Sequence, residues 1–244
     1  MTELFIMRDF DLHFGPEFCI TFDEAGQLTA KMDWHVHLDV FPIWLGFALD
    51  HVKAAALHRQ QRITARQAEE NEAFAEAMQM EFGESLQAVV AIATAVDALY
   101  SSIQSTVVIP KGLRETWSKN RTPRSSQVSE TFKRAYRLNG HDAQLTFTLI
   151  KELYRLRDRA VHPTVKSEAP VAHPEVDIAV PWYFAAYRST TAETLVMNVC
   201  AIVRQIAYST QPDNKNLIFH FNSLRQNMDR LTSHLTLEQP LTRK

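Results

Sequence analysis

Hydrophobic and polar residues alternate along residues 17–40, and the chain then takes up a helical period. The alternation runs through EFCITF, breaks at DEAGQ and resumes in LTAKMDWHVHLDV, which predicts two antiparallel strands joined by a turn. Gly26 can supply the positive φ that a tight turn needs. We therefore expect a small N-terminal β-hairpin.

From Pro42 onward the apolar residues recur at helical spacing. The first segment is rich in Ala, Gln and Glu, and it predicts one long helix or two shorter ones that end near Gly83. The next stretch, SLQAVVAIATAVDALYSSIQ (85–104), is apolar almost all round, which is typical of a central buried helix. Further helices are predicted over 125–138, 141–162, 190–209 and 213–235, and a proline-punctuated loop over 163–181.

These elements predict a mainly α fold, a helical bundle preceded by a small N-terminal β-hairpin. A chain of 244 residues, of which 45% are hydrophobic, is large enough to bury a real core. The expected organisation is a hairpin element (1–40), a long acidic linker helix or helix pair (41–82), the bundle (83–235) and a C-terminal tail (236–244).

Composition narrows the functional classes. The 26 basic and 28 acidic residues give a net charge of −2, so any affinity for nucleic acid must be local. Cys19 and Cys200 are single and far apart, which excludes a CxxC zinc site or a disulfide framework and suits a reducing cytosol. The six isolated glycines form neither a GxGxxG nor a Walker loop, so we expect no cofactor. The longest apolar runs are about half of the roughly 20 residues that span a bilayer, and no signal peptide is recognisable, so we expect a cytoplasmic protein without a membrane partner.

The second predicted strand carries one pattern with metal-ligand chemistry. In DWHVHLD, alternation places His35, His37 and Asp39 on the same side, where two imidazoles and a carboxylate could hold a divalent ion. The alternative is an exposed polar face of the hairpin, and no further histidine motif completes the ligand set. Serine and cysteine nucleophiles are disfavoured, because GxSxG is absent and both cysteines lie in apolar patterns.

Basic residues outnumber acidic ones between residues 111 and 137. This stretch could bind phosphates non-specifically, with Trp117 and Tyr136 as stacking groups, or it could be a solvated face only. The candidate nucleic-acid-binding residues are Lys111, Arg114, Arg121, Arg124, Lys133 and Arg134.

The helix predicted over 141–162 ends in ELYRLRDRAVHP, which contains Arg157 and His162 in an R-x4-H arrangement. Spacing alone is weak support, since Arg8 and His13 reproduce it near the N-terminus. Five helical residues separate two side chains by about 140° around the axis, but the residue before a proline is pushed out of the helical region. His162 can therefore turn back towards Arg157. The alternative is a structural helix end, where Arg157 complements the helix dipole and His162 caps a carbonyl.

The sequence LRDRAVHP resembles the signature of the HEPN superfamily, whose members carry R-x4–6-H near the end of a bundle helix, commonly with a polar residue after the arginine. Asp158 holds that place. AIATAVDALYSSIQ is similar to an earlier helix of that family, with Asp97 as the acidic residue in an Ala-rich run. The resemblance covers roughly residues 83–209. Thr164 stands where one common type of HEPN toxin has a tyrosine, so a tyrosine-based modification switch has no acceptor.

The resemblance implies a dimeric helical bundle that acts as a metal-independent endoribonuclease on single-stranded RNA, in toxin–antitoxin systems or antiviral defence. Arginine binds phosphate with two parallel hydrogen bonds, and histidine exchanges protons near neutral pH, so Arg157 would hold the phosphate and His162 would act as general acid and base. Two copies of the pair would meet across a twofold axis. Asp158 and Asp97 would orient these groups. A protein inhibitor could be a further partner, of unknown identity, and the alternative is a non-catalytic HEPN-fold module for binding or assembly.

Overall fold

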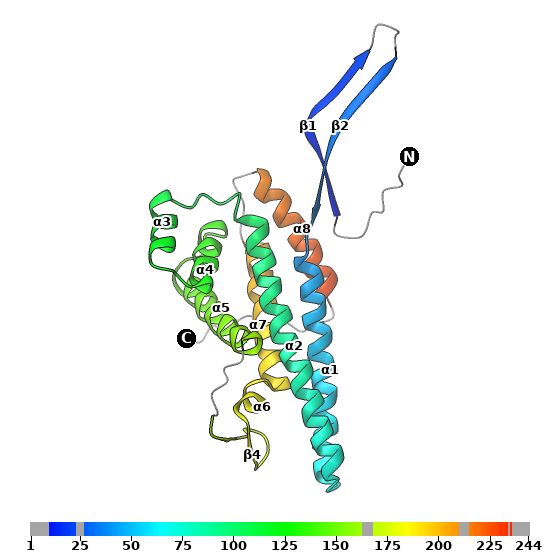
Figure 1. Ribbon diagram of the computed structural model, residues 1–244, viewed down its shortest axis with the longest axis vertical. Coiled ribbons are helices and arrows are strands. Elements are labelled where there is room, and N and C mark those ends of the chain that lie inside the picture. Colours follow the sequence, from blue (N-terminus) through cyan, green and yellow to red (C-terminus); the bar gives the residue numbers. More distant parts are fainter. Residues whose placement is uncertain (1–9, 23–26, 163–167, 210–214, 234, 236–244) are drawn as a thin grey trace. The chain divides into compact units, whose positions relative to one another are not determined.

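The computed structural model describes residues 10–22, 27–162, 168–209, 215–233 and 235. Its contacts divide the chain into two compact units, Met1–Val40 (unit 1) and Phe41–Lys244 (unit 2) (Figure 1). The described part is mainly helical, so the predicted fold class is confirmed.

Unit 1 contains an antiparallel pair of strands, β1 (Phe10–Phe22) and β2 (Leu28–Leu38). The register runs from Phe10 opposite Leu38 to Phe22 opposite Leu28, with an irregularity between Phe14 and Phe18. The predicted hairpin is therefore present, and β1 begins earlier than the alternation at residue 17 indicated. Gly26, the predicted turn residue, lies outside the described residues.

Unit 2 is a helical bundle with one short hairpin (Figure 1). Its first five helices are α1 (Phe41–Gln67), α2 (Asn71–Ile103), α3 (Lys111–Lys119), α4 (Arg124–Ala135) and α5 (Gly140–Val161). The remaining elements are β3 (Val171–Ala172), β4 (Ala179–Val180), α6 (Trp182–Ala186), α7 (Ser189–Ser209) and α8 (Lys215–Thr232). The segment 163–181, predicted as a loop, thus includes the antiparallel pair β3–β4, and α3 was not among the predicted helices.

The break between the first two helices of unit 2 differs from the prediction. The chain turns at residues 68–70, where Glu69 has a φ of 59°, and α2 then continues through Gly83. A Cβ at Gly83 would meet nothing within 4 Å, so this glycine needs no special conformation and only weakens the helix, by about 1 kcal/mol relative to alanine. Packing of α2 on α1 outweighs that cost. The expectation of a helix end near Gly83 was wrong, and the predicted segment boundary at 82/83 lies inside α2.

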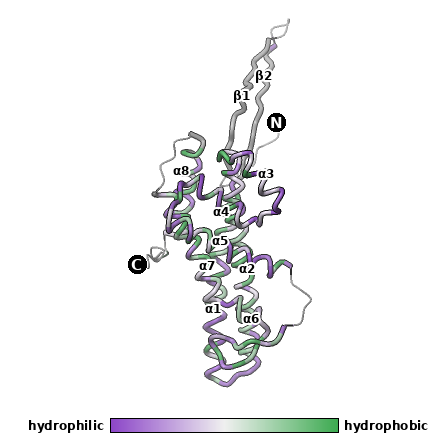
Figure 2. Tube along the Cα trace, turned by 90° about the vertical axis from the view of Figure 1, so that its left-hand side faces the viewer, coloured by the Kyte–Doolittle hydropathy of each residue, from purple (hydrophilic) through white to green (hydrophobic). Residues whose placement is uncertain are grey.

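Helix α2 is the centre of the bundle. It contacts α1, α4, α5, α6 and α7, and the small apolar residues of its second half are buried, as predicted for 85–104. Figure 2 shows hydrophobic and hydrophilic residues interspersed along the helices of this unit, as expected for amphipathic packing. By length and composition α2 is the one helix among the described residues that could cross a bilayer, but 56% of its most apolar window is buried inside the protein, as in the core helix of a globular bundle.

Two helices determine where the candidate site lies. Helix α5 packs against α4, α2 and α7, with Ile150, Leu153 and Leu156 buried, so its C-terminal end is held firmly by the core. Helix α3 is amphipathic and has no fully buried side chain. The partly buried residues Leu113 and Trp117 therefore hold it on the bundle, and a space remains between α3 and its neighbouring helices.

Candidate nucleic-acid interface

Arg157 lies in the last turns of α5 and meets a carboxylate from the central helix. Its Nη2 is 3.8 Å from Oδ2 of Asp97, and its Nε is 3.2 Å from Oδ1 of Asp158. The structure therefore brings together three of the four residues expected at the catalytic end of this helix.

Two further residues, which the R-x4-H pattern did not indicate, complete this group. Oδ1 of Asp97 accepts hydrogen bonds from the Tyr154 hydroxyl at 2.7 Å and from Nε of Arg124 at 3.0 Å. We call Asp97, Arg124, Tyr154 and Arg157 the Asp97 cluster. It joins α2, α4 and α5, and it places two guanidinium groups on one carboxylate.

Burial and charge distinguish the members of the Asp97 cluster. Tyr154 is buried, and its burial together with the hydrogen bond to Asp97 raises the pKa of its hydroxyl above the ordinary value of 10.0, so it stays a neutral donor. Burial lowers the pKa of Arg124, but the hydrogen bond and the charge of Asp97 outweigh it and the pKa is raised. Arg124 therefore remains cationic at every pH at which the protein is folded.

The guanidinium groups retain free donors. Nε of Arg157 is one of two buried side-chain nitrogen or oxygen atoms, among the described residues, that have no hydrogen-bond partner, because its approach to Asp158 lacks hydrogen-bond geometry. Within the described part of the chain, the Nη atoms of Arg124 form no hydrogen bond, and the only partner of those of Arg157 is the distant Asp97 oxygen. Side-chain exposures of 43% for Arg124 and 26% for Arg157 leave these donors open to a ligand.

His162 does not meet Arg157 within one chain. Its backbone leaves the helical path, with φ −122° and ψ 68°, as expected for a residue before proline. However, its N–H still bonds to the carbonyl of Asp158 at 2.8 Å, and its side chain is exposed. No hydrogen bond or ion pair joins it to Arg157 or to any other side chain that the structure describes. The expected approach of the imidazole to Arg157 thus has no hydrogen bond or ion pair behind it in the described chain, and the remaining helical hydrogen bond keeps the backbone of His162 at the tip of α5.

The six basic residues predicted to bind nucleic acid are all exposed, but they do not share one face. Arg124 and Lys133 are nine residues apart on α4, which corresponds to about 180° around the helix axis. Two members also pair with carboxylates of their own helices, Lys111 with Glu115 at 3.9 Å and Arg134 with Glu130 at 2.7 Å. Their charge is therefore partly neutralised locally.

The remaining two members lie in the segment around α3. Arg114 is on α3, and Arg121 lies in the turn that follows this helix, with a φ of 48°. Of the two aromatic residues suggested as stacking groups, Trp117 is half-buried on α3, whereas Tyr136 is 2% exposed and packs on Phe132 and Phe221. The role suggested for Tyr136 was wrong, since its ring belongs to the core.

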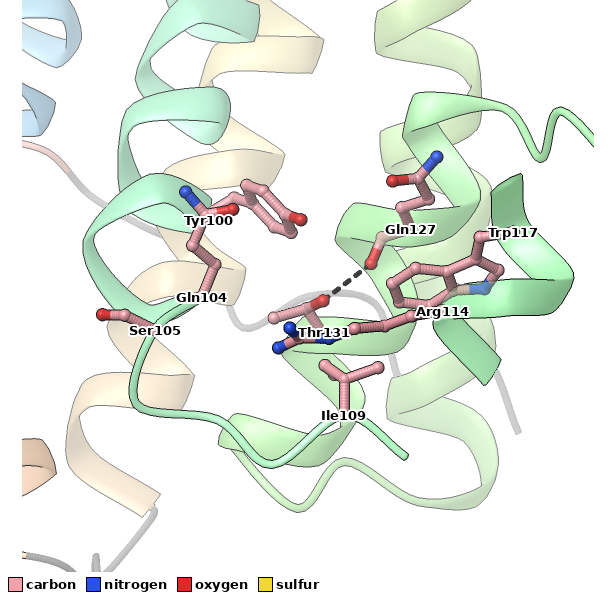
Figure 3. A pocket seen from close by; sticks show the side chains of 8 residues that line it. All are labelled: Tyr100, Gln104, Ser105, Ile109, Arg114, Trp117, Gln127 and Thr131. Atoms are coloured by element: carbon pink, nitrogen blue, oxygen red, sulfur yellow. Dashed lines mark hydrogen bonds between the residues drawn. The ribbon is translucent and has the colours of Figure 1, made fainter. Parts of the chain in front are cut away.

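A cavity of about 470 Å³ lies between α2, α3 and α4 (Figure 3). We call it the α3 cavity. Its principal lining side chains are Tyr100 and Gln104 from the C-terminal end of α2, Arg114 and Trp117 from α3, and Gln127 and Thr131 from α4. Arg114 and Trp117 are among the residues predicted from the sequence, whereas the other lining residues are not.

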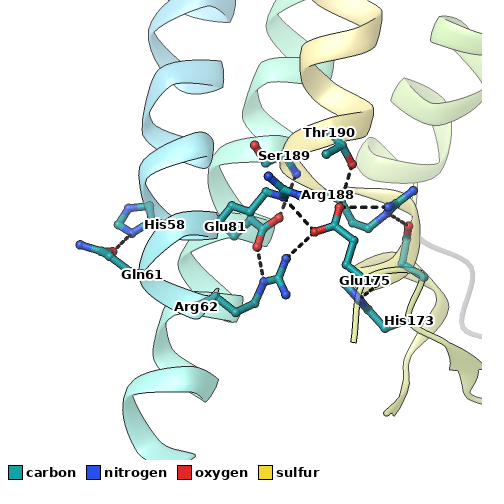
Figure 4. A network of polar contacts seen from close by, with 11 residues as sticks. His58, Gln61, Arg62, Glu81, His173, Glu175, Arg188, Ser189 and Thr190 are labelled. Atoms are coloured by element: carbon teal, nitrogen blue, oxygen red, sulfur yellow. Dashed lines mark hydrogen bonds and ion pairs between the residues drawn. The ribbon is translucent and has the colours of Figure 1, made fainter. Parts of the chain in front are cut away.

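A second charged group, which the sequence analysis missed, is buried between α1, α2 and α7 (Figure 4). Arg62 is 1% exposed; its Nε donates to Glu81 at 2.6 Å and its Nη2 to Glu175 at 2.8 Å. Arg59 and Arg188 also donate to Glu175, at 2.9 and 3.2 Å. We call these five residues the Arg62 network.

Backbone groups and a hydroxyl complete the Arg62 network. The N–H of Ser189, at the start of α7, donates to Glu81 at 3.1 Å, and the Thr190 hydroxyl donates to Glu175 at 3.1 Å. A helix N-terminus favours negative charge, so both carboxylates are well placed there. Nδ1 of His173 accepts the N–H of Glu175, and burial lowers the pKa of His173. This network fastens the β3–β4 connection to the bundle.

The metal-site alternative lies largely on unit 1. Strand β2 carries His35 and His37, and the register places His35 opposite His13, but the side chains of both strands are outside the described part. Among the described residues, no group of three or more His, Cys, Asp or Glu side chains could hold a metal ion. The hypothesis built on His35, His37 and Asp39 thus stays a prediction.

Comparisons of this chain with protein-family models, with curated proteins and with solved structures find no match. The resemblance to the HEPN superfamily therefore rests on the residues around Asp97 and Arg157 themselves. What the geometry defines is a helical bundle with an exposed, arginine-rich cluster beside a cavity.

Proposed function

We propose that this chain is a cytoplasmic HEPN-type protein that binds single-stranded RNA as a homodimer and cleaves it without a metal ion, as a nuclease of a toxin–antitoxin or defence system. The observation that carries the proposal is the Asp97 cluster. One carboxylate orients the guanidinium groups of Arg124 and Arg157, whose outer donors are open to solvent.

A phosphate oxygen suits the donors that the cluster leaves unused. Guanidinium groups bind phosphate through paired N–H···O hydrogen bonds, and two of them on adjacent helices can hold one phosphodiester from two sides. The Nη atoms of Arg124 form no hydrogen bond within the described part of the chain, and those of Arg157 have only the distant Asp97 oxygen, so these outer donors are available to a phosphate oxygen. Asp97 offsets one of the two positive charges in the free protein, so binding depends on geometry as well as on net charge.

Cleavage requires His162 in addition. In the proposed reaction the 2′-oxygen of the ribose attacks the adjacent phosphorus, and one imidazole accepts the proton of the 2′-OH. A second, protonated imidazole gives a proton to the departing 5′-oxygen, which leaves a 2′,3′-cyclic phosphate and a 5′-hydroxyl end. An exposed His162 at the tip of α5 is accessible to a second subunit, and His162 of the partner subunit would supply the second imidazole.

The second candidate function is a non-catalytic RNA-binding module. The observation in its favour is the absence of any contact between Arg157 and His162 in the described chain. In that case His162 has only a structural role at the end of α5, and the Asp97 cluster binds RNA without cleaving it.

Three variants of the full chain distinguish these possibilities: Arg124→Ala, Arg157→Ala and His162→Ala. Binding is measured by fluorescence anisotropy of a labelled mixed-sequence RNA at several salt concentrations, and cleavage by gel electrophoresis with EDTA present. Loss of each arginine should reduce the slope of log affinity against log salt by about 0.7, the value for one phosphate contact on a single strand. His162→Ala should leave binding within about twofold and slow cleavage by about 10²- to 10⁴-fold.

Arg155→Ala is the matched control on α5. Arg155 is half-exposed and pairs with Glu152 on the same helix. Its replacement by alanine removes one positive charge, as the replacement of Arg157 does. The double variant Arg8→Ala/His13→Ala controls for the R-x4-H spacing itself. If the parent and His162→Ala proteins cleave RNA equally, His162 is not catalytic and the second candidate function, the non-catalytic RNA-binding module, is left. If neither Arg124→Ala nor Arg157→Ala changes the RNA affinity, the proposed function is rejected altogether. Light scattering after size-exclusion chromatography tests the dimer.

A further inference from the structure

The α3 cavity adjoins the Asp97 cluster through Tyr100, which contacts Arg124. Tyr100 lines the cavity, and the guanidinium of Arg124 lies 4.1 Å from the centre of its ring. A group in the cavity would therefore be next to a group bound at Arg124. One ligand molecule can therefore place one of its parts in the cavity and a neighbouring part at Arg124.

The size and walls of the cavity suit a flat aromatic ring. Its volume of about 470 Å³ falls in the range of roughly 300–1,000 Å³ that is usual for small-ligand pockets. The half-buried indole of Trp117 and the ring of Tyr100 lie on its walls. Aromatic side chains in such positions stack on bases of any sequence, because every base has a π-face.

The polar lining offers both donors and acceptors. Nε2 of Gln127 donates to the carbonyl of Thr122 at 2.8 Å, which leaves its Oε1 as an acceptor without a hydrogen bond to any described residue. Figure 3 shows the Tyr100 hydroxyl directed towards Gln127 across the space. Gln104 and Arg114 are exposed, and their side chains form no hydrogen bond with the described part of the protein.

This combination of groups matches the hydrogen-bonding edge of a nucleobase, on which donors and acceptors alternate. The lining contains one cation, Arg114, and its described residues include no carboxylate. A cationic ligand is therefore disfavoured, and a neutral heteroaromatic ring with an attached phosphate fits the cavity together with Arg124.

We propose that the α3 cavity holds one base of the RNA strand whose phosphate lies at Arg124 and Arg157, with Trp117 as the stacking residue. The inference rests on the proposed RNA binding and adds to it a base subsite. The same chemistry is present in a free nucleotide, so the experiment compares the two sources.

The test uses the full chain and three probes: a labelled 12-nucleotide RNA, the same backbone with every base removed, and the four 5′-mononucleotides. Trp117→Ala should weaken binding of the intact RNA by about 5- to 100-fold, the usual range for loss of one stacked base, and should leave binding of the abasic strand unchanged. Trp117→Phe should restore most of the affinity, because it keeps an aromatic face. Gln104→Ala should weaken intact-strand binding by about 2- to 10-fold through loss of one hydrogen bond.

Leu113→Ala is the control for disturbance of α3, since Leu113 is the other partly buried residue of this helix and does not line the cavity. Thermal unfolding shows that each variant remains folded. If Arg124→Ala weakens RNA binding but Trp117→Ala and Gln104→Ala do not, the base subsite is rejected while the proposed RNA binding stands. If the parent protein binds neither strand, the proposed function fails first. A mononucleotide that binds as tightly as the intact strand also overturns the inference and assigns the cavity to a free nucleotide.

Discussion

The Arg62 network and the Asp97 cluster both place arginines around carboxylates, but they differ in exposure. Arg62 and Glu81 have side-chain exposures of 1% and 4%, whereas Arg124 and Asp97 have 43% and 29%. In the first group, no buried side-chain nitrogen or oxygen lacks a partner, whereas in the second the Nη atoms of Arg124 form no hydrogen bond with any described residue. A buried ionic group must be satisfied internally, while an exposed one can leave donors for a ligand.

The difference assigns the two regions different tasks. The Arg62 network ties α1, α2 and the start of α7 to the β3–β4 connection, so its removal should affect folding. The Asp97 cluster orients two cations at the surface, so its removal should affect binding. The same arginine-to-alanine change at the two places therefore separates stability from function.

The largest expected effect is that of Arg62→Ala. It leaves Glu81 buried without its cation, and we expect a loss of about 3–5 kcal/mol in the free energy of unfolding, measured by urea denaturation. Arg62→Met combined with Glu81→Gln should be less damaging than Arg62→Ala alone, because it removes the buried charge together with its partner. Lys53→Ala, which removes an exposed pair with Asp50, is the control and should cost less than about 1 kcal/mol. If Arg62→Ala also cost less than about 1 kcal/mol, the structural role of the network would be contradicted.

An intermediate effect is expected from acid. Burial alone raises the pKa of Glu175, but hydrogen bonds from Arg59, Arg62 and Thr190 outweigh it and lower the pKa from 4.5 to about 2. Because the folded pKa is depressed, Glu175 stabilises the protein above pH about 4.5, and that stabilisation is lost as the pH falls towards 2. The contribution is about 3 kcal/mol. Urea unfolding of the parent and Glu175→Gln proteins between pH 2 and 7 tests this: their difference should be largest at neutral pH and shrink over this window. A difference that does not change with pH would show that the carboxylate charge is not involved.

The smallest expected change in stability is that of Arg124→Ala. Arg124 is 43% exposed, so solvent screens its ion pair with Asp97, and we expect a loss of no more than about 1 kcal/mol in the free energy of unfolding. The same variant should lower RNA affinity, whereas Arg62→Ala, assayed at a temperature where it is folded, should not. A large loss of stability in Arg124→Ala would erase the distinction between the two regions.

Most of the helices could be predicted from the sequence, and the turns and strands that were missed have local causes. The period of 3.6 residues located α4, α5, α7 and α8 to within a few residues. The turn at residues 68–70 was missed because it contains neither Gly nor Pro, and the positive φ of Glu69 is uncommon for a residue other than glycine. The pair β3–β4 was missed because two-residue strands have no readable alternation.

The candidate site could be predicted only in part. Asp97 and Arg157 were expected together from the resemblance, and the structure places them on adjacent helices with their side chains 3.8 Å apart. Arg124 was expected only as one of several basic residues, since nothing in a charge run shows which member faces a carboxylate 27 positions earlier. Tyr154 and Tyr100 were not singled out, because an aromatic residue in an apolar helix pattern usually belongs to the core.

By itself, the sequence of this protein determined the helical class, the N-terminal hairpin, the buried character of α2 and the residue types available for phosphate chemistry. These properties depend on local periodicity and composition, which neighbouring residues encode directly. Only the tertiary structure decided that Asp97 binds Arg124, Tyr154 and Arg157, that Arg62 is a buried cation and that His162 forms no hydrogen bond with its expected partner. Each of those outcomes depends on how distant helices rotate and pack, which is set by the burial of the whole core.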